Sequence, residues 1–298
     1  MLSSPDLLTK ALVNAYKLYG YDGMINVFDP TLEAEACGCS IVWEGENSTP
    51  LIKNHPLSDI KNISEIDIST LERKGRFPVC LEATKRLKIL IGREVAIIGV
   101  LTGPVTLASY LSGREIVMEI ESEFERVAEI LDFTSKVVLK ICRTYCELNV
   151  DGIMVADEML AKVTPVLLSK VSRYFKPIWN MTRFYNCFSI IWTRDCYDIF
   201  QCQNIMGLGA DGAILGCYTP ILQSGQGKCL GLAIPISVLC GKKEEIEEKI
   251  SELLKSKPMG SFFLTTENDI PFDAPIDHIF QLVHNAKLKC STQYDTSK

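Results

Sequence analysis

Short apolar runs alternate with longer amphipathic stretches along most of the chain. Each apolar run has four to seven residues and ends in a small or polar residue, a pattern typical of buried strands. The predicted strands are Gly23–Phe28, Val95–Leu101, Gly152–Ala156, Ile178–Met181, Gly212–Leu215, Leu230–Pro235 and Ser261–Leu264.

The intervening stretches have helical spacing, most clearly in Ile116–Leu148 and Glu244–Lys255. Strands that alternate with helices of this length predict a parallel sheet. No glycine-rich dinucleotide loop is present, which favours a closed (β/α)8 TIM barrel over a Rossmann sheet. An eighth strand is not apparent, and Cys39–Trp43 is interpreted as part of a β-hairpin inserted after the first strand. We expect residues 1–298 to form this single domain.

Composition agrees with a large globular enzyme. The 298 residues are 47% hydrophobic and 23% charged, and the net charge of −6 argues against general binding of nucleic acid or anionic membrane. No segment reaches the roughly 18 apolar residues of a membrane span, and the first residues lack a signal peptide's apolar block. We therefore expect a cytoplasmic protein, whose twelve cysteines are free thiols in a reducing cell.

A barrel brings the residues that follow each strand to one mouth, although they are distant in sequence. Each of these polar residues alone could equally be a loop or helix cap, but a polar ring at strand ends is the usual form of an active site. The ring comprises Asp29, Thr102, Tyr110, Asp157, Glu158, Asn180, Thr182, Arg183, Glu267, Asn268 and Asp269.

Several segments, in order, resemble the uroporphyrinogen-decarboxylase-like superfamily, which includes corrinoid-dependent methyltransferases. They are YDGMINVFDPTLEAEACGCSIVWEGENSTPLI, IGVLTGPVTLASYL, DGIMVADEMLAKVTP, GADGAILG and FFLTTENDIPFDAPIDHI. The resemblance covers nearly the whole chain and implies the TIM barrel. It also implies that Asp29 is the catalytic aspartate, that Tyr110 is the active-site tyrosine, and that a homodimer forms.

The absence of one motif separates the branches of this superfamily. The decarboxylases have an arginine-rich segment near the N-terminus that clamps substrate carboxylates, whereas this chain has no arginine before Arg73. The short N-terminus is also closer to that of the methyltransferases. In thiol-methylating members a His-x-Cys pair and a later Cys hold zinc. Asn180, Thr182 and Asn268 stand where those ligands are expected, so we predict no metal site.

Amides and carboxylates at the mouth match the donor and acceptor edges of a pterin. The leading hypothesis is therefore methyl transfer between a corrinoid protein and tetrahydrofolate, without zinc, in which geometry is the main source of catalysis. Asn180, Asn268, Asp157 and Asp29 are the predicted catalytic residues. The predicted substrate-binding residues are Glu158, Tyr110, Thr182, Arg183, Asp269 and Trp179.

Three alternatives remain open at this point. The enzyme could take a methyl group from an ether, amine or halide and pass it to the corrinoid protein. It could be a uroporphyrinogen-decarboxylase-type lyase, or a corrinoid-binding relative without activity.

Overall fold

The protein is described by a computed structural model that covers residues 3–45, 48–194, 196, 198–216, 227–256 and 260–295. Within these residues the main sheet has seven strands in the order β1-β4-β5-β6-β7-β8-β9, and every neighbouring pair is parallel. The strands are β1 (Gly23–Ile25), β4 (Ala96–Thr102), β5 (Gly152–Ala156), β6 (Phe188–Trp192), β7 (Gly212–Ile214), β8 (Cys229–Ile234) and β9 (Phe262–Thr266). This order confirms the predicted parallel α/β architecture.

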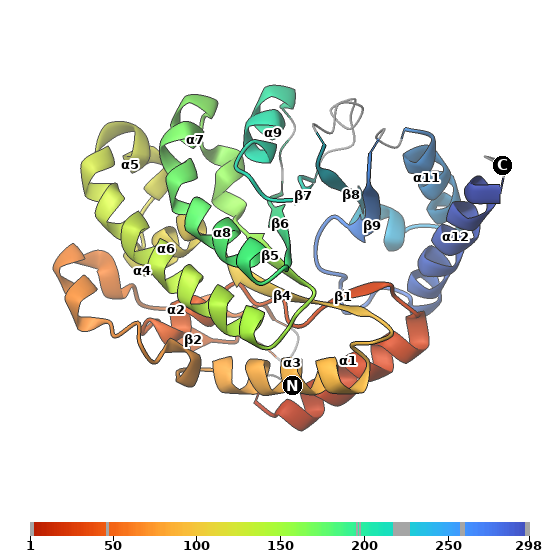
Figure 1. Cartoon of the computed structure of the whole chain (residues 1–298), viewed down its shortest axis with the longest axis horizontal. Coiled ribbons are helices and arrows are strands. Elements are labelled where there is room, and N and C mark those ends of the chain that lie inside the picture. Colours follow the sequence, from red (N-terminus) through yellow and green to blue (C-terminus); the bar gives the residue numbers. More distant parts are fainter. Residues whose placement is uncertain are drawn as a thin grey trace.

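Helices surround the curled sheet as an arc in Figure 1. The α-helices are α1 (Pro5–Tyr19), α2 (Leu32–Ala36), α3 (Phe77–Leu90), α4 (Pro104–Ser112), α5 (Ile116–Ser122), α6 (Phe124–Glu147), α7 (Pro165–Val171), α8 (Lys176–Phe184), α9 (Ile199–Met206), α10 (Ile236–Leu239), α11 (Lys243–Lys255) and α12 (Ile276–Asp295). The 3-10 turns are η1 (Pro56–Ser58), η2 (Ile60–Glu65), η3 (Leu71–Arg73), η4 (Glu158–Lys162) and η5 (Ser172–Tyr174).

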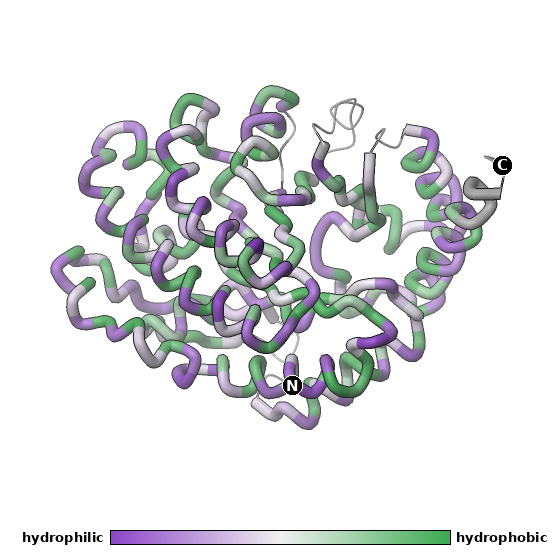
Figure 2. Tube along the Cα trace, viewed as in Figure 1, coloured by the Kyte–Doolittle hydropathy of each residue, from purple (hydrophilic) through white to green (hydrophobic). Residues whose placement is uncertain are grey.

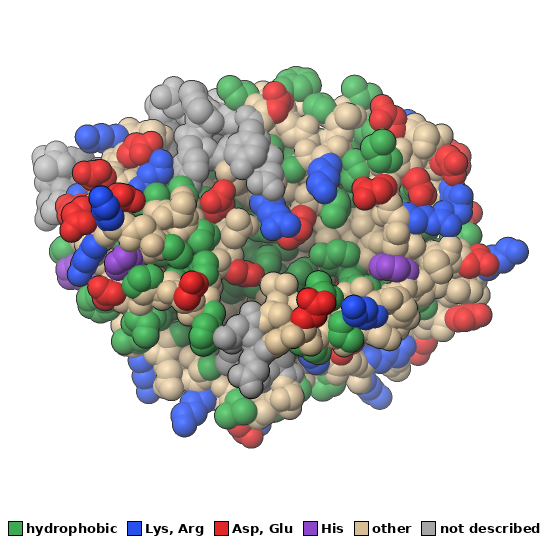
Figure 3. Space-filling model, turned by 180° about the vertical axis from the view of Figure 1, so that it is seen from behind, with side chains coloured by type: hydrophobic (Ala, Val, Ile, Leu, Met, Phe, Trp, Pro, Cys, Tyr) green, Lys and Arg blue, Asp and Glu red, His purple; other side chains and the backbone are tan. Residues whose placement is uncertain are grey.

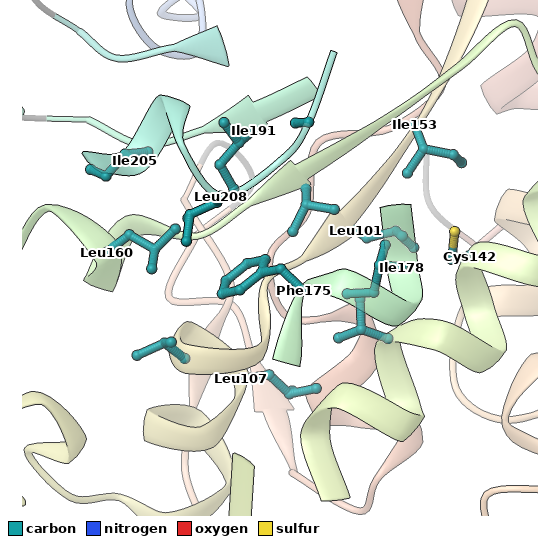
Figure 4. Packing of buried hydrophobic residues seen from close by; sticks show 14 of the residues in the cluster. Leu101, Leu107, Cys142, Ile153, Leu160, Phe175, Ile178, Ile191, Ile205 and Leu208 are labelled. Atoms are coloured by element: carbon teal, nitrogen blue, oxygen red, sulfur yellow. The ribbon is translucent and has the colours of Figure 1, made fainter. Parts of the chain in front are cut away.

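The strands bury apolar side chains on both faces, because successive residues of a strand point to opposite sides. One set packs against the helices: Figure 4 shows Leu101, Ile153 and Ile191 beside Phe175 and Ile178. Hydrophobic and hydrophilic residues alternate within the turns of the helices in Figure 2, as expected for helices with one buried face. The second set fills the concave side of the sheet, and it comprises Val100, Met154, Ala156, Ile190, Trp192 and Ile214.

The helices next to the two outermost strands, β1 and β9, contact each other. Helix α12 contacts α1, and Lys287 Nζ lies 2.9 Å from the Asp22 carboxylate just before β1. Among the described strands no pairing joins β9 to β1, so the expected eightfold closure is not observed there. Between β1 and β4, the two-residue strands β2 (Ile41–Val42) and β3 (Leu51–Ile52) pair antiparallel.

One predicted strand is wrong. The segment Ile178–Met181 lies inside helix α8, and the strand of this βα unit is Phe188–Trp192. Pro177 stands in the first turn of α8, where proline is well tolerated. The four-residue window was too short to separate helical from strand periodicity.

Most described cysteines are free, but two are paired. Cys196 and Cys202 form a disulfide, which corrects the expectation of free thiols throughout. The nine free cysteines are Cys37, Cys39, Cys80, Cys142, Cys146, Cys187, Cys229, Cys240 and Cys290, and Cys217 lies outside the described residues. No helix in the described part of the chain is long and apolar enough to cross a bilayer.

Candidate functional site

The carboxyl ends of the parallel strands all lie at one end of the sheet, and polar side chains gather there. We call five of them the mouth cluster: Asp29, Tyr110, Glu158, Arg194 and Asp269. Their charges act on one another, because Asp29, Glu158 and Arg194 each influence the titration of both Tyr110 and Asp269. Residues spread over some 240 positions of sequence therefore share one electrostatic environment.

Aromatic side chains form an apolar floor beneath the cluster. Phe28 and Trp192 meet edge to face with ring centroids 5.4 Å apart, and Phe263 packs into the same group of side chains. The far side of the molecule from the view of Figure 1 is hollowed near its middle, with hydrophobic side chains in the hollow and charged ones beside it (Figure 3). An apolar surface with a few polar groups is typical of small-molecule sites.

The Glu158–Arg194 ion pair is the main charged contact of the cluster. Arg194 Nη2 lies 2.9 Å from Glu158 Oε2, and the two side chains are 46% and 18% exposed. Burial, together with the charges of Glu158 and Asp29, raises the pKa of Asp269 to about 6 against the opposing charge of Arg194. Burial likewise raises the pKa of Tyr110 to about 12, and Glu158 adds to the effect. Asp269 is itself an exposed residue, so solvent reaches its carboxyl.

Asp157 has a different environment. Its carboxylate is fully buried and accepts hydrogen bonds from Val105 N at 2.9 Å, Thr106 N at 3.0 Å and Thr106 Oγ1 at 2.7 Å. These donors lie in the first turn of α4, so Asp157 satisfies the free N–H groups of that helix end. Burial raises the pKa of Asp157 to about 7, against the effect of these hydrogen bonds. Both carboxylate oxygens are engaged in holding α4 against β5.

Asp29 is also buried, being 7% exposed, but it belongs to the mouth cluster. Its Oδ1 accepts from Thr31 N at 2.9 Å and from Thr31 Oγ1 at 2.6 Å. Its Oδ2 forms an ion pair with Arg76, which enters from the start of α3. Asp29 is therefore a fixed carboxylate at the β1 edge of the mouth.

Behind Asp29 lies a second buried acid, Glu33, which is 1% exposed. Its Oε2 lies 2.8 Å from Thr102 Oγ1, which is also 2.9 Å from the carbonyl oxygen of Pro30. Glu33 Oε1 has no hydrogen-bond partner. Burial raises the pKa of Glu33 to about 7, and the nearby Asp29 adds to the effect while Thr102 opposes it.

Four predicted site residues lie on α8, away from the mouth. Trp179 Nε1 donates to Leu208 O at 3.0 Å, and Arg183 Nη2 donates to Gly209 O at 2.7 Å. Leu208 and Gly209 precede β7, so these contacts lie toward the amino ends of the strands. Arg183 was expected just after a strand and Trp179 near the mouth, but both lie on an outer helix.

Asn180 and Thr182 lie on the same outer helix, α8. Asn180 is exposed, and its Oδ1 is 3.5 Å from Arg183 Nη1; Thr182 is fully buried and donates to Trp179 O at 2.9 Å. Asn268, by contrast, follows β9 by two residues and is half-buried at the mouth end. The amide pair that motivated the pterin hypothesis is therefore not assembled.

Arg194 is the residue that sequence reasoning missed. It follows β6, two positions after Trp192. Because side chains two positions apart in a strand point to the same face, Arg194 is expected on the concave side of the sheet with Trp192. The signal was present in the aromatic and β-branched run Phe188–Trp192, which favours a strand. No group of three or more His, Cys, Asp or Glu side chains suited to a metal occurs among the described residues.

Comparison with known proteins identifies the family. The model of the uroporphyrinogen decarboxylase family matches residues 1–288. The chain belongs to this family.

Curated relatives lie among the methyltransferases. The chain is 28% identical over 168 residues to the methylcobamide:CoM methyltransferase MtaA of Methanosarcina barkeri, a match that covers 56% of this chain and 48% of that protein. It is 28% identical over 142 residues to the methylcobamide:CoM methyltransferase MtbA of Methanosarcina acetivorans, with 48% and 42% covered. The chain spans about half the length of the curated relatives it matches.

Solved structures share the fold of this family member. A methyltransferase from Methanosarcina mazei superimposes with a TM-score of 0.83 at 20% identity, over 96% of this chain and 86% of that one. A B12-independent methionine synthase from Shewanella sp. W3-18-1 gives 0.63 at 12% identity, over 97% and 88%.

Proposed function

We propose that this protein transfers a methyl group between a corrinoid-carrying partner protein and a small acceptor. The observation that carries the proposal is the mouth cluster, where Glu158, Arg194 and Asp269 lie over an aromatic floor. This site occurs in a chain whose curated relatives are named methylcobamide:CoM methyltransferases. We extend the proposal to a single-domain cytoplasmic enzyme.

The corrinoid would supply the methyl group on its cobalt. This chain's part is to receive the acceptor and align its nucleophilic atom with that methyl, because alignment is the main contribution to an in-line displacement. Phe28, Trp192 and Phe263 offer an apolar surface that excludes water. Zinc has no part in this proposal, because the described residues hold no group of three or more His, Cys, Asp or Glu side chains suited to it.

We favour a thiol as the acceptor. The names of the curated relatives point to coenzyme M, and the tetrahydrofolate hypothesis rested on Asn180, which lies on an outer helix. In this proposal the Asp269 carboxylate takes the thiol proton, helped by a pKa near 6. The sulfur–methyl bond forms as the cobalt–carbon bond breaks, and the electron pair of that bond stays on the metal.

The test is an acceptor competition with purified protein. Methylcobalamin would be incubated with 2-mercaptoethanesulfonate or with tetrahydrofolate, and the methylated products would be measured by mass spectrometry. Methylation of the thiol, abolished in Asp269→Asn and retained in the exposed control Asp273→Asn, supports the proposal. Methylation of tetrahydrofolate alone would replace the acceptor, and no transfer to either compound would contradict the proposed function.

Family membership alone does not favour decarboxylation. The decarboxylase reading requires arginines that are available to substrate carboxylates. In the described mouth, Arg76 is engaged by Asp29 and Glu35, and Arg194 by Glu158. Incubation with a porphyrinogen, followed by its loss of carboxylates, would test this alternative directly.

A further inference from the structure

Arg76 reaches the mouth from a distant part of the sequence. It is the residue before α3, and its guanidinium contacts three different acceptors. It forms an ion pair with Asp29, its Nη2 donates to Thr31 Oγ1 at 2.9 Å, and its Nε donates to Glu35 Oε2 at 2.7 Å. The side chain is only 11% exposed, so these contacts are largely shielded from water.

The surroundings of Arg76 are built to hold it in place. Its guanidinium carbon lies 4.9 Å from the ring centre of Trp43, and its backbone N–H donates to Glu35 Oε2 at 3.2 Å. Gly75 has φ of +54°, and a Cβ there would come within 2.9 Å of the Glu35 carboxylate. Only glycine allows the chain to turn here while Glu35 stays against Arg76.

Asp29 is consequently held from both sides. Thr31 engages one oxygen with two hydrogen bonds, and Arg76 engages the other. A planar guanidinium fixes the direction of a carboxylate as well as its charge. The charge of Asp29 in turn acts on Tyr110 and Asp269 across the mouth. Burial alone would lower the pKa of Arg76, but Asp29 and Glu35 outweigh it and raise that pKa, so Arg76 remains a cation.

We infer that Arg76 is a positioning residue for methyl transfer: it acts through Asp29, whose carboxylate it holds in one orientation at the edge of the mouth. This inference rests on the proposed function. It differs from a purely structural role, because a displaced carboxylate at the reacting site slows turnover even when the protein remains folded.

The experiment compares Arg76→Met, Arg76→Lys and a matched control in the methyl-transfer assay. Arg76→Met should lower kcat roughly 100-fold and leave KM within about threefold, since a misplaced group near the chemistry costs rate rather than affinity. Arg76→Lys keeps the positive charge but lacks the planar guanidinium with its several N–H donors, so its kcat should lie between those of Arg76→Met and the wild type. The control is Arg86→Met in helix α3, which Arg76 precedes; Arg86 pairs with Glu82 and Asp6 on the surface. It should leave both constants unchanged.

A second variant tests the same role if Arg76→Met does not fold. Gly75→Ala forces Glu35 away from Arg76 without removing any charge, and it should lower kcat to an intermediate value. Unchanged kcat in folded Arg76→Met, or losses in thermal stability that fully account for lost activity in all variants, would overturn the positioning role. Wild-type protein without any methyl transfer would instead overturn the proposed function, and the positioning role would fall with it.

Discussion

At the residue scale, the two contacts of the Thr102 hydroxyl lead us to predict that Glu33 carries a proton. The single hydroxyl hydrogen of Thr102 cannot serve both Pro30 O, at 2.9 Å, and Glu33 Oε2, at 2.8 Å. Both contacts are satisfied if Glu33 is protonated and donates to Thr102, which donates to Pro30. The raised pKa of Glu33, about 7 as a result of burial, agrees with this count of hydrogens.

This arrangement predicts a pH-dependent stability. The folded pKa of about 7 exceeds the ordinary 4.5, so the stabilisation is present below pH 4.5 and is lost as pH rises through 7. At about 1.4 kcal/mol per pKa unit, Glu33 makes wild-type protein up to about 3 kcal/mol less stable at pH 8.5 than at acid pH. Glu33→Gln mimics the protonated acid and should remove this loss.

Denaturant midpoints at pH 5.5 and 8.5 would measure the effect. Glu82→Gln, on the exposed face of α3, is the matched control and should follow wild type at both values. If Glu33→Gln showed the same drop between the two pH values as wild type, the protonated assignment would be wrong.

At the element scale, the start of α4 depends on an acid from the neighbouring strand. Asp157 accepts three hydrogen bonds from Val105 and Thr106, and Gly103 leaves room for it, since a Cβ there would overlap the Asp157 side chain. The acid after β5 therefore links two βα units. A motif that resembles a catalytic acid in sequence is, in its contacts, also a helix cap.

We predict that Asp157→Ala lowers the free energy of unfolding by about 2 kcal/mol, because buried N–H groups lose their acceptor. The comparison is Asp198→Ala, which removes an exposed cap of α9 whose side chain accepts from Gln201 N at 2.7 Å. That change should cost about 1 kcal/mol. Chemical denaturation would rank the two, and equal losses would mean that burial does not add to the cap.

The position of Asn180 on helix α8 leads to another prediction at this scale. Asn180 is exposed on the outer helix, so Asn180→Ala should leave kcat and KM of methyl transfer within about twofold of wild type, the usual range for a residue with no contact to the site. Activity would be measured with a thiol and with tetrahydrofolate as acceptors. A large loss in this variant would mean that Asn180 takes part in the reaction.

At the scale of the whole molecule, the curled sheet brings the ends of the chain's two outermost strands into one site. Asp29 follows β1 and Asp269 follows β9, yet the charge of Asp29 raises the pKa of Asp269 while Arg194 lowers it. The site is completed by curvature, since no described strand pair joins β1 to β9.

Two substitutions should therefore move the titration of Asp269 in opposite directions from its value of about 6. Asp29→Asn removes a negative charge and should lower the pKa, whereas Arg194→Met removes a positive charge and should raise it. Carboxyl carbon NMR, with the signal assigned through Asp269→Asn, would follow both shifts. Shifts of the same sign, or none, would show that these groups do not share a mouth.

Local patterns determined much of this protein. Apolar runs between amphipathic stretches were sufficient for the parallel α/β architecture, for most strands and for the strand-end positions of Asp29, Glu158 and Asp269, because periodicity is a property of neighbouring residues. They failed at residues 178–192, where a four-residue run fits a helix as well as a strand. Which polar residues meet, that Arg76 pairs with Asp29, and that Asp157 caps α4 were decided only by tertiary structure. Such contacts join residues about 50 positions apart, and they depend on the curvature of the sheet rather than on local spacing.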